Sequence, residues 1–442
     1  MSIAEVRFSE LASRLDADYY RPEFVENEAL LPRLASSPLA QVADLATDRV
    51  DPAASPADEF GYIDITNVDV IDGSVTLQRM RGWQASSRAR KRVAEGDVLV
   101  STVRPNRSAI ALIDASLAGA VGSTGFAVVR PRAIDPAFLF AYLKTRFARL
   151  QLVRRTSATL YPAVAEASVL RLLVPPVADA VRRGIASSIR AAIRARGEAR
   201  DAYDKALGAL YAKLGRPRRT ATEVAYEVPF SSLGETLDAP DHHPLYVETL
   251  DLLHSSGSPV VLLSEAARWR RETFRPETEP ATAYDVVELE DVSQEDGTLR
   301  RVRHLRGWEV GGPRVRFRAG DILLSRLRFY LREIALVPRD ASGGLCSPEF
   351  YALEPKLDPH YLLAYLRSDF GYNQMRFKSE GSTRPRYPRN KAANLQVAVP
   401  EPEVQREIGD AMRRAHEARY RSRRLVQEAV RHLEHHIASL SP

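Results

Sequence analysis

The sequence has very little cysteine and no long apolar segment. Cys346 is the single cysteine in 442 residues, so neither an intramolecular disulfide nor a multi-cysteine metal site can form. No uninterrupted apolar run is long enough to cross a bilayer. The N-terminal stretch MSIAEVRFSELASRLDADYY is charged throughout and lacks an apolar core, which predicts no signal peptide. Together these absences predict a protein of the reducing cytoplasm.

Sequence motifs for common enzymatic chemistry are missing as well. There is no N-P-P-[YF] motif and no G-x-G-x-x-G loop, so nothing indicates a pocket for a methyl donor. There is also no G-x-x-x-x-G-K-[ST] phosphate loop, which argues against an ATP-driven motor. We therefore expect no catalytic residues, no bound metal and no cofactor.

Two weaker patterns could still indicate a metal site. Glu349, Glu354 and Lys356 loosely resemble the carboxylate–x–lysine core of metal nucleases, but the equivalent stretch of the first half, FAVVRPRA, lacks it. His432 and His436 lie four residues apart, as two ligands on one helix face would. No third ligand stands beside them in the sequence, so a solvated helix face is the better interpretation.

Positive charge is in mild excess and is clustered. The net charge is +6 and the isoelectric point is about 9.3. The basic residues gather in two stretches, Arg79, Arg81, Arg88, Arg90, Lys91 and Arg92, and then Arg300, Arg301, Arg303, Arg306, Arg314, Arg316 and Arg318. Clustered arginine is typical of proteins that bind a polyanion, and a solvated surface is the alternative.

The chain repeats itself over a long distance. GDVLVSTVR at 96–104 returns 224 residues later as GDILLSRLR at 320–328. Other matches keep the same order with offsets between 222 and 226: Leu15-Asp16-Ala17 with Leu237-Asp238-Ala239, Arg81-Gly82-Trp83 with Arg306-Gly307-Trp308, Asp135-Pro136 with Asp358-Pro359, and Tyr161-Pro162 with Tyr387-Pro388. A colinear series of this length indicates a duplicated domain and not a solenoid unit.

Each half combines a mixed module with a long helix. Short runs such as DVLVSTV and FYALE, bounded by Gly, Pro and Asp, are typical of strands, whereas IDPAFLFAYLKTRF and LDPHYLLAYLRSDF each predict a helix that begins at proline. We predict an α+β fold built of two similar α/β modules and two long helices. Its parts are a first module at 1–176, a central helix at 177–214, a linker at 215–225, a second module at 226–401 and a C-terminal helix at 402–442.

An apolar seam runs along both predicted helices in alternating steps of mostly four and three residues. Its large members are Ile185, Ile189, Tyr203 and Leu210 in the first helix, and Ile408, Met412, Val426 and Leu433 in the second. This spacing is the coiled-coil period, so we expect the helices to pair as an antiparallel spacer that relates the halves by a pseudo-two-fold axis. The alternative is that each helix packs on the core of its own module.

The two modules share framework residues but differ in basic loops. Arg, Asn, Ser and Thr are the side chains that bond base edges and phosphates, so these loops predict two DNA readers of different sequence preference. The candidate DNA-binding residues are Arg81, Arg104, Asn106, Arg107, Arg154, Arg155 and Thr156 in the first half, and Arg306, Arg326, Arg328, Tyr330, Arg332, Thr383, Arg384, Arg386, Arg389, Asn390 and Lys391 in the second.

Over essentially its whole length the sequence resembles the specificity subunit of a type I restriction–modification system. The resemblance rests on G-D-[VI]-L-[VL]-S, on the following D-P helix, on the V-P step into the long helix, on LDADYYRP at 15–22, and on their duplication in order. It implies two target-recognition domains, each of which reads one half of a split, asymmetric DNA target. It also implies that the helices set the gap and dock the methyltransferase subunits, expected to be two.

Some features depart from that family or leave its details open. In the second LDA segment, Asp241-His242 replaces the pair Tyr19-Tyr20, which puts a docking role of this segment in doubt. Restriction subunits are possible further partners. The alternatives to a non-catalytic subunit are a nuclease or methyltransferase with an unrecognised motif, and a scaffold whose two modules bind proteins. Gly215-Arg216-Pro217-Arg218-Arg219 resembles half of a minor-groove hook, although a helix stop and linker is the plainer interpretation.

Overall fold

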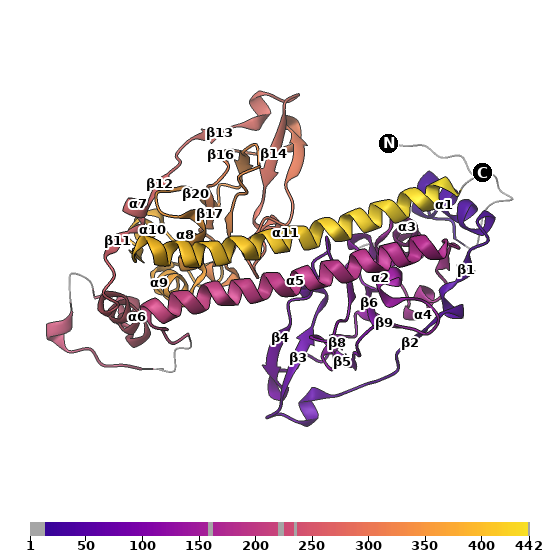
Figure 1. Cartoon of the computed structure of the whole chain (residues 1–442), viewed down its shortest axis with the longest axis horizontal. Helices are drawn as coiled ribbons and strands as arrows, with labels where there is room; N and C mark the ends of the chain where they lie inside the picture. The colour runs from indigo at the N-terminus through magenta and orange to yellow at the C-terminus, as the bar shows by residue number, and fades with distance from the viewer. Residues whose placement is uncertain (1–13, 158–161, 220–224, 234–236, 441–442) are drawn as a thin grey trace. The chain divides into compact units, whose positions relative to one another are not determined.

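The computed structural model describes residues 14–157, 162–219, 225–233 and 237–440, and the chain divides into two units. Unit 1 comprises residues 1–195 and 421–442, and unit 2 comprises residues 196–420. The predicted leaderless N-terminus up to residue 13, Tyr161 of the repeat, residues 220–224 of the linker and the last two residues lie outside the described ranges. Both division points fall inside the long helices α5 (Asp179–Leu214) and α11 (Pro402–Ser439), so each helix begins in one unit and ends in the other (Figure 1).

Unit 1 contains two four-stranded sheets and a short strand pair. The strand orders are β2-β9-β6-β7 and β4-β3-β8-β5, and β1 pairs with β10. The strands are β1 (Ser37–Pro38), β2 (Ala43–Leu45), β3 (Glu59–Ile63), β4 (Gln78–Arg81), β5 (Ala89–Arg92), β6 (Val98–Ser101), β7 (Ile110–Leu112), β8 (Val121–Ser123), β9 (Phe126–Pro131) and β10 (Leu173–Val174). The helices are α1 (Pro22–Arg33), α2 (Pro136–Lys144), α3 (Arg146–Arg154) and α4 (Glu166–Val169).

Unit 2 repeats this plan with one additional strand. Its sheets have the orders β12-β20-β17-β18 and β13-β16-β19-β14-β15, and β11 pairs with β21. The strands are β11 (Val260–Leu262), β12 (Ala267–Trp269), β13 (Thr273–Phe274), β14 (Ala283–Val287), β15 (Arg303–Arg306), β16 (Arg314–Phe317), β17 (Ile322–Ser325), β18 (Ile334–Leu336), β19 (Gly344–Cys346), β20 (Phe350–Pro355) and β21 (Gln396–Ala398). The helices are α6 (Pro244–Ser255), α7 (Leu263–Ala266), α8 (Pro359–Arg367), α9 (Asp369–Lys378) and α10 (Arg389–Ala393).

The strand registers show that the two modules share one fold. Val98 lies opposite Val129 in the β6–β9 pair, and Ile322 lies opposite Leu353 in the β17–β20 pair, 224 positions further on in both strands. The predicted α+β class with two similar modules is therefore confirmed. Among the described residues, no helix is both long and apolar enough to span a membrane.

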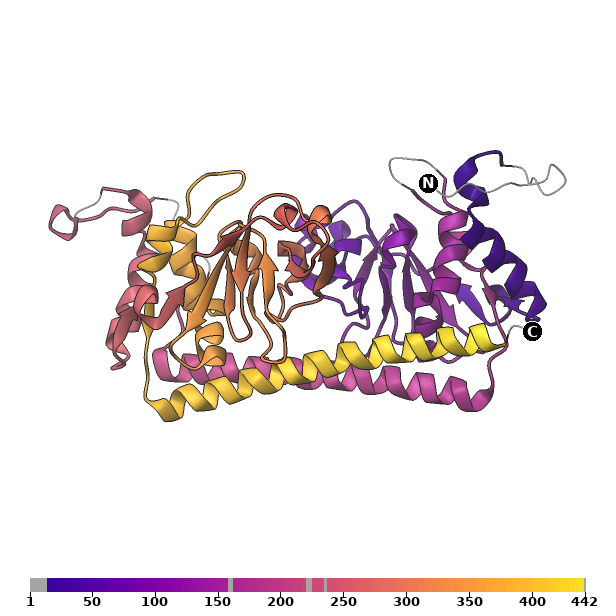
Figure 2. The ribbon, with the colours of Figure 1, turned by 90° about the horizontal axis from the view of Figure 1, so that it is seen from above.

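Each module has three layers, with the sheet that contains the repeated strand in the middle. In unit 1, Val98 and Val100 face the cluster that includes α2 and the long helices, whereas Leu99 faces the cluster next to the second sheet. In unit 2, Ile322 and Leu323 face opposite sides in the same way. A strand covered on both faces needs a continuous apolar run, which explains VLV and ILL. Figure 2 shows the strands of unit 1 on one side of its helix segments.

The Gly-Asp pair that precedes this strand has a structural role. Gly96 and Gly320 have positive φ angles of 88° and 82°, a backbone region that glycine adopts without the steric cost of a side chain. The buried carboxylates of Asp97 and Asp321 accept hydrogen bonds from the backbone N–H groups three residues earlier, at 2.9 and 2.8 Å. The Gly-Asp pair recurs because both modules use the same turn to start the same strand.

One predicted helix in each half is in fact two helices. The stretch IDPAFLFAYLKTRF forms α2 and the start of α3, with a break at Thr145, whose φ and ψ of −66° and 157° are not helical. The Thr145 hydroxyl accepts a hydrogen bond from the N–H of Ala148 and so caps α3. Ser368 makes the equivalent break between α8 and α9 and caps α9 through the N–H of Phe370.

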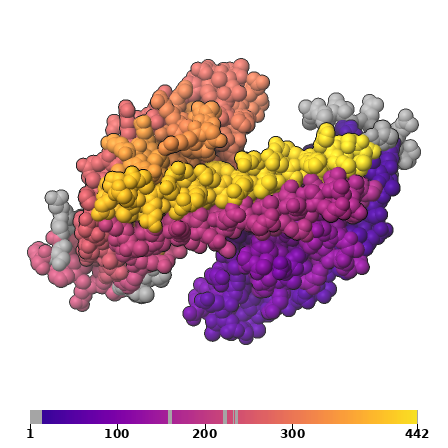
Figure 3. All heavy atoms as spheres, viewed as in Figure 1, coloured from indigo at the N-terminus to yellow at the C-terminus, as the bar shows by residue number. Residues whose placement is uncertain are grey.

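The long helices are antiparallel, and their seam is buried within each unit. In unit 1, the hydroxyl of Ser422 on α11 donates to the carbonyl of Ala192 on α5 at 2.7 Å, and in unit 2 Lys213 pairs with Glu401 at 2.9 Å. The predicted seam residues Ile185, Ile189, Leu210, Ile408, Met412, Val426 and Leu433 are buried, and Tyr203 is partly buried. Because the same clusters contain strand residues, each helix packs both on its partner and on a module core, so both interpretations of the seam hold. Figure 3 shows the surfaces of the two helices side by side.

Candidate nucleic-acid interface

Two basic loops that are far apart in sequence lie together in unit 2. The N–H of Arg328 donates to the carbonyl of Pro385 at 2.9 Å, and the N–H of Tyr387 donates to the carbonyl of Arg326 at 2.7 Å. Leu327 and Arg386 form an isolated β-bridge between the same segments. The structure thus brings the candidate residues of 326–332 and of 383–391 onto one surface.

The second of these loops is closed by its own backbone. Glu380 and Arg386 exchange N–H···O=C hydrogen bonds of 2.7 and 2.8 Å, which hold the base of the loop. Thr383 and Arg384 lie at its exposed tip, and Arg389 and Asn390 are exposed in the first turn of α10. A closed base with an exposed basic tip is suited to contact an external ligand.

Acidic and aromatic side chains orient the arginines of this surface. The carboxylate of Glu349 lies 2.5 Å from Arg386 and 3.8 Å from Arg326, and Glu380 lies 3.1 Å from Lys391. The Arg389 guanidinium lies 5.3 Å from the centre of the Trp269 ring, a cation–π distance. The two carboxylates stand among these four cations and the exposed Arg384, so the surface keeps an excess of positive charge.

Next to this surface, Glu333 is buried and titrates unusually. Burial raises the pKa of Glu333 to about 6, while the amide of Gln294 and the nearby cations Arg328 and Arg300 act in the opposite direction. Its carboxylate accepts a hydrogen bond from the side chain of Gln294 at 3.2 Å. The charge beneath the 326–332 loop therefore changes near pH 6, whereas the matching position of unit 1 is Ala109.

Unit 1 has the same loop arrangement with different side chains. The N–H of Arg104 donates to the carbonyl of Pro162 at 2.7 Å, and Val103 forms an isolated β-bridge with Ala163. Asn106 and Arg107 are exposed in the turn that follows. Asn106 stands where unit 2 has Tyr330, which is 46% exposed, so the shared backbone presents different chemistry in the two units.

The first loop of each unit carries backbone strain at matching positions. Arg104 and Ser108 have φ angles of 49° and 54°, and Arg328 and Arg332 have φ angles of 52° and 50°. Residues other than glycine rarely adopt this left-handed conformation, and such strain concentrates at functional sites. Both units keep the strained backbone of this loop, although its side chains differ. The same backbone conformation can therefore present different contacts in the two units.

Several predicted contact residues have partners inside the protein. Arg154 pairs with Glu28 on α1 and lies 4.2 Å from the centre of the Tyr19 ring. Arg155 donates to the carbonyl of Gln151 at 2.9 Å, and Thr156 bonds within its own turn. In unit 2, Arg332 pairs with Asp369 at 3.1 Å and stacks over Tyr372. Sequence reasoning missed these partners because most lie far away along the chain.

Arg81 and Arg306 lie apart from the paired loops. They end strands β4 and β15, which belong to the sheet other than the one that carries the loops. Both residues are exposed, and Arg306 donates to the carbonyl of Ala281 at 2.9 Å. Their contact with DNA stays a prediction.

Unit 2 also has a basic cleft that was not among the predicted sites. A cavity of about 760 Å³ beside β12 is lined by Ser264, Ala267, Arg268, Trp269, Arg270, Arg271, Glu272, Arg318, Glu354 and Lys356. In unit 1, the register places Asp44 where β12 has Arg268, so this cationic lining is not repeated. The run RWRR at 268–271 is the signal that could have indicated it.

The patterns that suggested metal chemistry do not form a metal site within the part of the chain that the structure describes. Glu349 pairs with Arg386, and Glu354 lies 3.6 Å from Arg270. No group of three or more His, Cys, Asp or Glu residues in the described ranges could hold a metal ion. Burial raises the pKa of the Cys346 thiol, which disfavours the reactive thiolate.

The residues of the proposed minor-groove hook fold back on unit 2. Gly215 has a φ of 81° and ends α5, as the plainer interpretation requires. Arg216 lies over the Tyr211 ring, and Arg218 pairs with Glu248 at 2.7 Å.

No family model and no curated protein matches the sequence, but several solved structures are similar to it. The crystal structure of the HsdS subunit from Thermoanaerobacter tengcongensis is 22% identical, with a TM-score of 0.34, and the match covers 92% of this chain and 95% of that one. A structure described as the basis of complex assembly and conformational transition of the type I R-M system is 24% identical, with a TM-score of 0.33 and coverages of 91% and 95%. The type-I restriction-modification system S subunit from M. genitalium is 13% identical, with a TM-score of 0.42 and coverages of 92% and 96%.

Proposed function

We propose that this protein is a non-catalytic, sequence-specific DNA-binding subunit that acts in the cytoplasm. It recognises a bipartite, asymmetric DNA target and directs methyltransferase subunits, and restriction subunits where the system has them, to that target. Each unit reads one half of the target through its paired loops. The observation that carries the proposal is the strained loop mount at Arg104–Ser108 and Arg328–Arg332, which is the same in both units but presents different side chains.

The chemistry of the paired loops supports DNA as the ligand. Their exposed residues include Arg, Asn and Thr, which bond phosphates and base edges. Arginine held by a carboxylate, as Arg386 is by Glu349, is oriented for a directed contact with a base edge or a phosphate. The basic cleft beside β12 adds a surface for the phosphate backbone of the same duplex.

Charge removal on the loop tests the proposal directly. We expect the triple variant Arg384→Gln, Arg386→Gln and Arg389→Gln to weaken DNA binding and to flatten its dependence on salt, because fewer counterions are released. Where one of these residues reads a base, discrimination at one half-site should fall by about 1–3 kcal/mol per bidentate contact. Binding isotherms at several salt concentrations, with target and mismatched duplexes, measure both effects.

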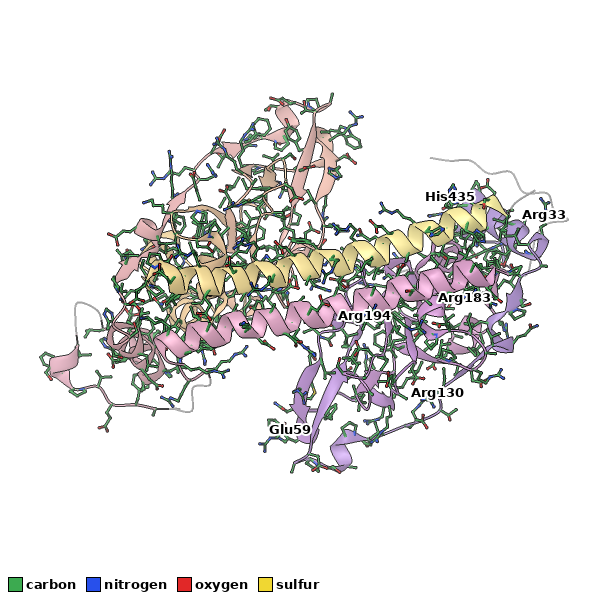
Figure 4. The ribbon with its side chains drawn as sticks, in the orientation of Figure 1. Arg33, Glu59, Arg130, Arg183, Arg194 and His435 are labelled. Carbon is green, nitrogen blue, oxygen red and sulfur yellow. The ribbon has the colours of Figure 1, made fainter. Side chains whose placement is uncertain are left out.

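A matched control removes the same charge elsewhere. Arg183, Arg194 and Arg200 are exposed on α5, and Figure 4 marks the first two on that helix. Their replacement by Gln should leave the salt slope close to that of the unaltered chain. Equal slopes for the loop variant and the unaltered chain would place the DNA elsewhere.

The enzyme alternative is separated from the proposal by a simple assay. The purified chain, incubated with DNA, a methyl donor and magnesium, should neither methylate nor cut the DNA. Activity above the level of contaminants would favour a self-contained nuclease or methyltransferase. Co-expression with a methyltransferase subunit should instead yield a stable complex.

A further inference from the structure

Two tryptophans at matching positions are exposed to the same extent. Trp83 and Trp308 are each 68% exposed, although large aromatic side chains are usually mostly buried. Each follows the dipeptide Arg-Gly in the repeated motif, within the short helices η6 (Gly82–Gln84) and η12 (Gly307–Glu309). An exposed indole that is retained in both copies of a duplicated module has no role in packing the module core.

The turn that presents each tryptophan is tightly constrained. A Cβ atom on Gly82 would lie 2.2 Å from the carbonyl oxygen of Ser55, and one on Gly307 would lie 2.4 Å from that of Glu279. No side chain fits at either glycine without movement of backbone. The tryptophan therefore stands on a turn that packs directly against the backbone of a neighbouring segment.

The hydrogen bonds of the two turns correspond one to one. Gly82 donates to Asp58 at 2.9 Å and Trp83 donates to Pro56 at 3.1 Å. The same N–H groups of the second turn bond the carbonyls of Thr282 and Pro280, at 2.9 and 3.3 Å. Both copies thus hold the backbone of the tryptophan in the same way, which lowers the entropy cost of ordering this turn in an interface.

The repetition identifies the kind of partner. The loops proposed to read DNA differ between the units, because each half of an asymmetric target has its own sequence. A residue that is exposed and identical in both units must meet something that is identical at both places. Leu15 and Leu237, both 81% exposed, show that Trp83 and Trp308 are not an isolated case.

The charges around the tryptophans favour a protein partner over DNA. Near Trp83, the exposed Asp58 and Glu59 accompany Arg79 and Arg81. Near Trp308, the exposed carboxylates Glu277, Glu279 and Glu309 accompany Arg275 and Arg306. Surfaces that follow DNA are strongly positive, whereas this mixture of both signs is typical of the rim of a protein interface.

We propose that Trp83 and Trp308 anchor two copies of one protein, one copy on each unit. Each copy offers an apolar pocket for the indole, since tryptophan is among the residues most enriched at interface hot spots. The inference rests on the proposed function, which makes the methyltransferase subunit this partner.

Stoichiometry tests the anchors. In native mass spectrometry of the purified chain with the methyltransferase subunit, the unaltered chain should carry two copies of the subunit. Trp83→Ala and Trp308→Ala should each carry one copy, and the double variant none, with an affinity loss of about 30-fold or more at each altered site. Leu262→Ala, which truncates an unrepeated residue that is 38% exposed, is the control and should carry two copies.

DNA binding by the chain alone separates this inference from the proposed function. The double variant should bind DNA as the unaltered chain does. A double variant that still carries two methyltransferase subunits contradicts the proposal that Trp83 and Trp308 bind them. If that variant also loses DNA affinity, the two tryptophans contact DNA instead. If the unaltered chain does not bind DNA at all, the proposed function fails while the stoichiometry still decides the anchors.

Fluorescence gives a second measurement that does not depend on truncation. The chain contains three tryptophans, so Trp269→Phe with Trp308→Phe leaves Trp83 as the sole indole. Its emission should shift to shorter wavelength when the subunit is added, because the indole leaves water, and should not shift with DNA alone. An emission that responds only to DNA contradicts the proposal.

Discussion

At the level of single residues, one pair of facing strand positions keeps its register in both modules, but the acidic and basic residues have changed places. Asp44 lies opposite Arg130 in the β2–β9 pair, whereas Arg268 lies opposite Glu354 in the matching β12–β20 pair. The side chains form their ion pairs with other residues: Asp44 lies 2.6 Å from Arg132, Arg130 lies 2.9 Å from Asp97, and Glu354 lies 3.6 Å from Arg270. The sequence displays all four residues, but only the register shows that they face one another.

The buried aspartate of the Gly-Asp turn finds its arginine on a different strand in each module. Asp97 pairs with Arg130 on β9 at 2.9 Å, and Asp321 pairs with Arg270, just after β12, at 2.5 Å. The repeat marked this Gly-Asp pair because both of its residues recur. It could not predict the partner, because the guanidinium reaches the carboxylate from β9, next to β6, in one module and from the end of β12, two strands from β17, in the other.

A half-buried histidine should make the stability of unit 2 sensitive to acid. Burial, together with the neighbouring His416, Arg413 and Arg339, lowers the pKa of His360 from 6.5 to about 3. The folded protein keeps this imidazole neutral, whereas the unfolded chain takes up a proton below pH 6.5. The resulting stability is present above pH 6.5 and is lost as the pH falls towards 3.

We expect proton uptake by His360 in the unfolded chain to reduce the free energy of unfolding by about 1 kcal/mol between pH 7 and pH 5.5, after allowance for the partial exposure of the ring. His360→Gln should lack that part of the pH dependence, which urea unfolding at the two pH values would reveal. His435→Gln removes an exposed histidine from α11 (Figure 4) and serves as the control. Parallel pH profiles for His360→Gln and the unaltered chain would contradict the prediction.

At the level of elements, the sequence predicted the strands in DVLVSTV and FYALE and the two long helices, and it missed the breaks between α2 and α3 and between α8 and α9. Thr145 and Ser368 interrupt helices whose apolar pattern continues through them, so the apolar period alone gave one helix instead of two. The side chains of Thr145 and Ser368 cap the following helix, and such local side-chain hydrogen bonds compete with a continuous helix. The side-chain amide of Gln151 donates to the carbonyl of Leu173 and accepts a hydrogen bond from its N–H, and Gln374 makes the same two bonds with Gln396. The matches in sequence did not reveal this repeated interaction.

For the candidate site, the sequence indicated the loops but not their internal contacts. The repeat separated framework from variable loops, and the structure brings 326–332 and 383–391 together. It also ties Arg154 to Glu28, 126 residues away, through packing of α3 on α1. Composition marks a loop as basic, but only the tertiary structure shows which of its arginines already have partners.

Helix α5 offers a direct test of how much its glycines cost. Gly184 and Gly208 are exposed within the helix, and a Cβ atom on either would meet no heavy atom within 4 Å. Alanine at each position should raise the free energy of unfolding by about 0.5–1 kcal/mol, because glycine loses more backbone entropy in a helix. Denaturant titration monitored by circular dichroism measures the gain.

Gly409 on α11 is the contrasting position. A Cβ atom there would lie 2.4 Å from the carboxylate of Asp358, which caps α8. Gly409→Ala should therefore lower stability although it also raises helix propensity. A gain in stability at Gly409, or a loss at Gly184 and Gly208, would mean that the local environment of these helices differs from the one described.

At the level of the whole molecule, the two long helices belong to both units. Residues 179–195 of α5 lie in unit 1 and residues 196–214 in unit 2, while α11 divides between Tyr420 and Arg421. The apolar seam keeps one register through both division points. If the units read two half-sites, the length of these helices should fix the number of base pairs between them.

An inserted heptad in each helix tests this dependence. Seven residues after Ala195 and seven after Tyr420 fall at the division points and lengthen each helix by about 10 Å, or about three base pairs. A heptad also preserves the seam, whereas two inserted residues would rotate the downstream apolar stripe by about 200° and unpack it. We therefore expect the heptad variant to fold, to recognise the same two half-sites and to require a gap about three base pairs longer. Methylation mapping of a genome modified by this variant, together with its methyltransferase subunit, measures the gap and both half-sites in one experiment. The two-residue variant should lose activity or stability. An unchanged gap in the heptad variant, with altered half-sites, would show that the helices do not set the spacing of the target.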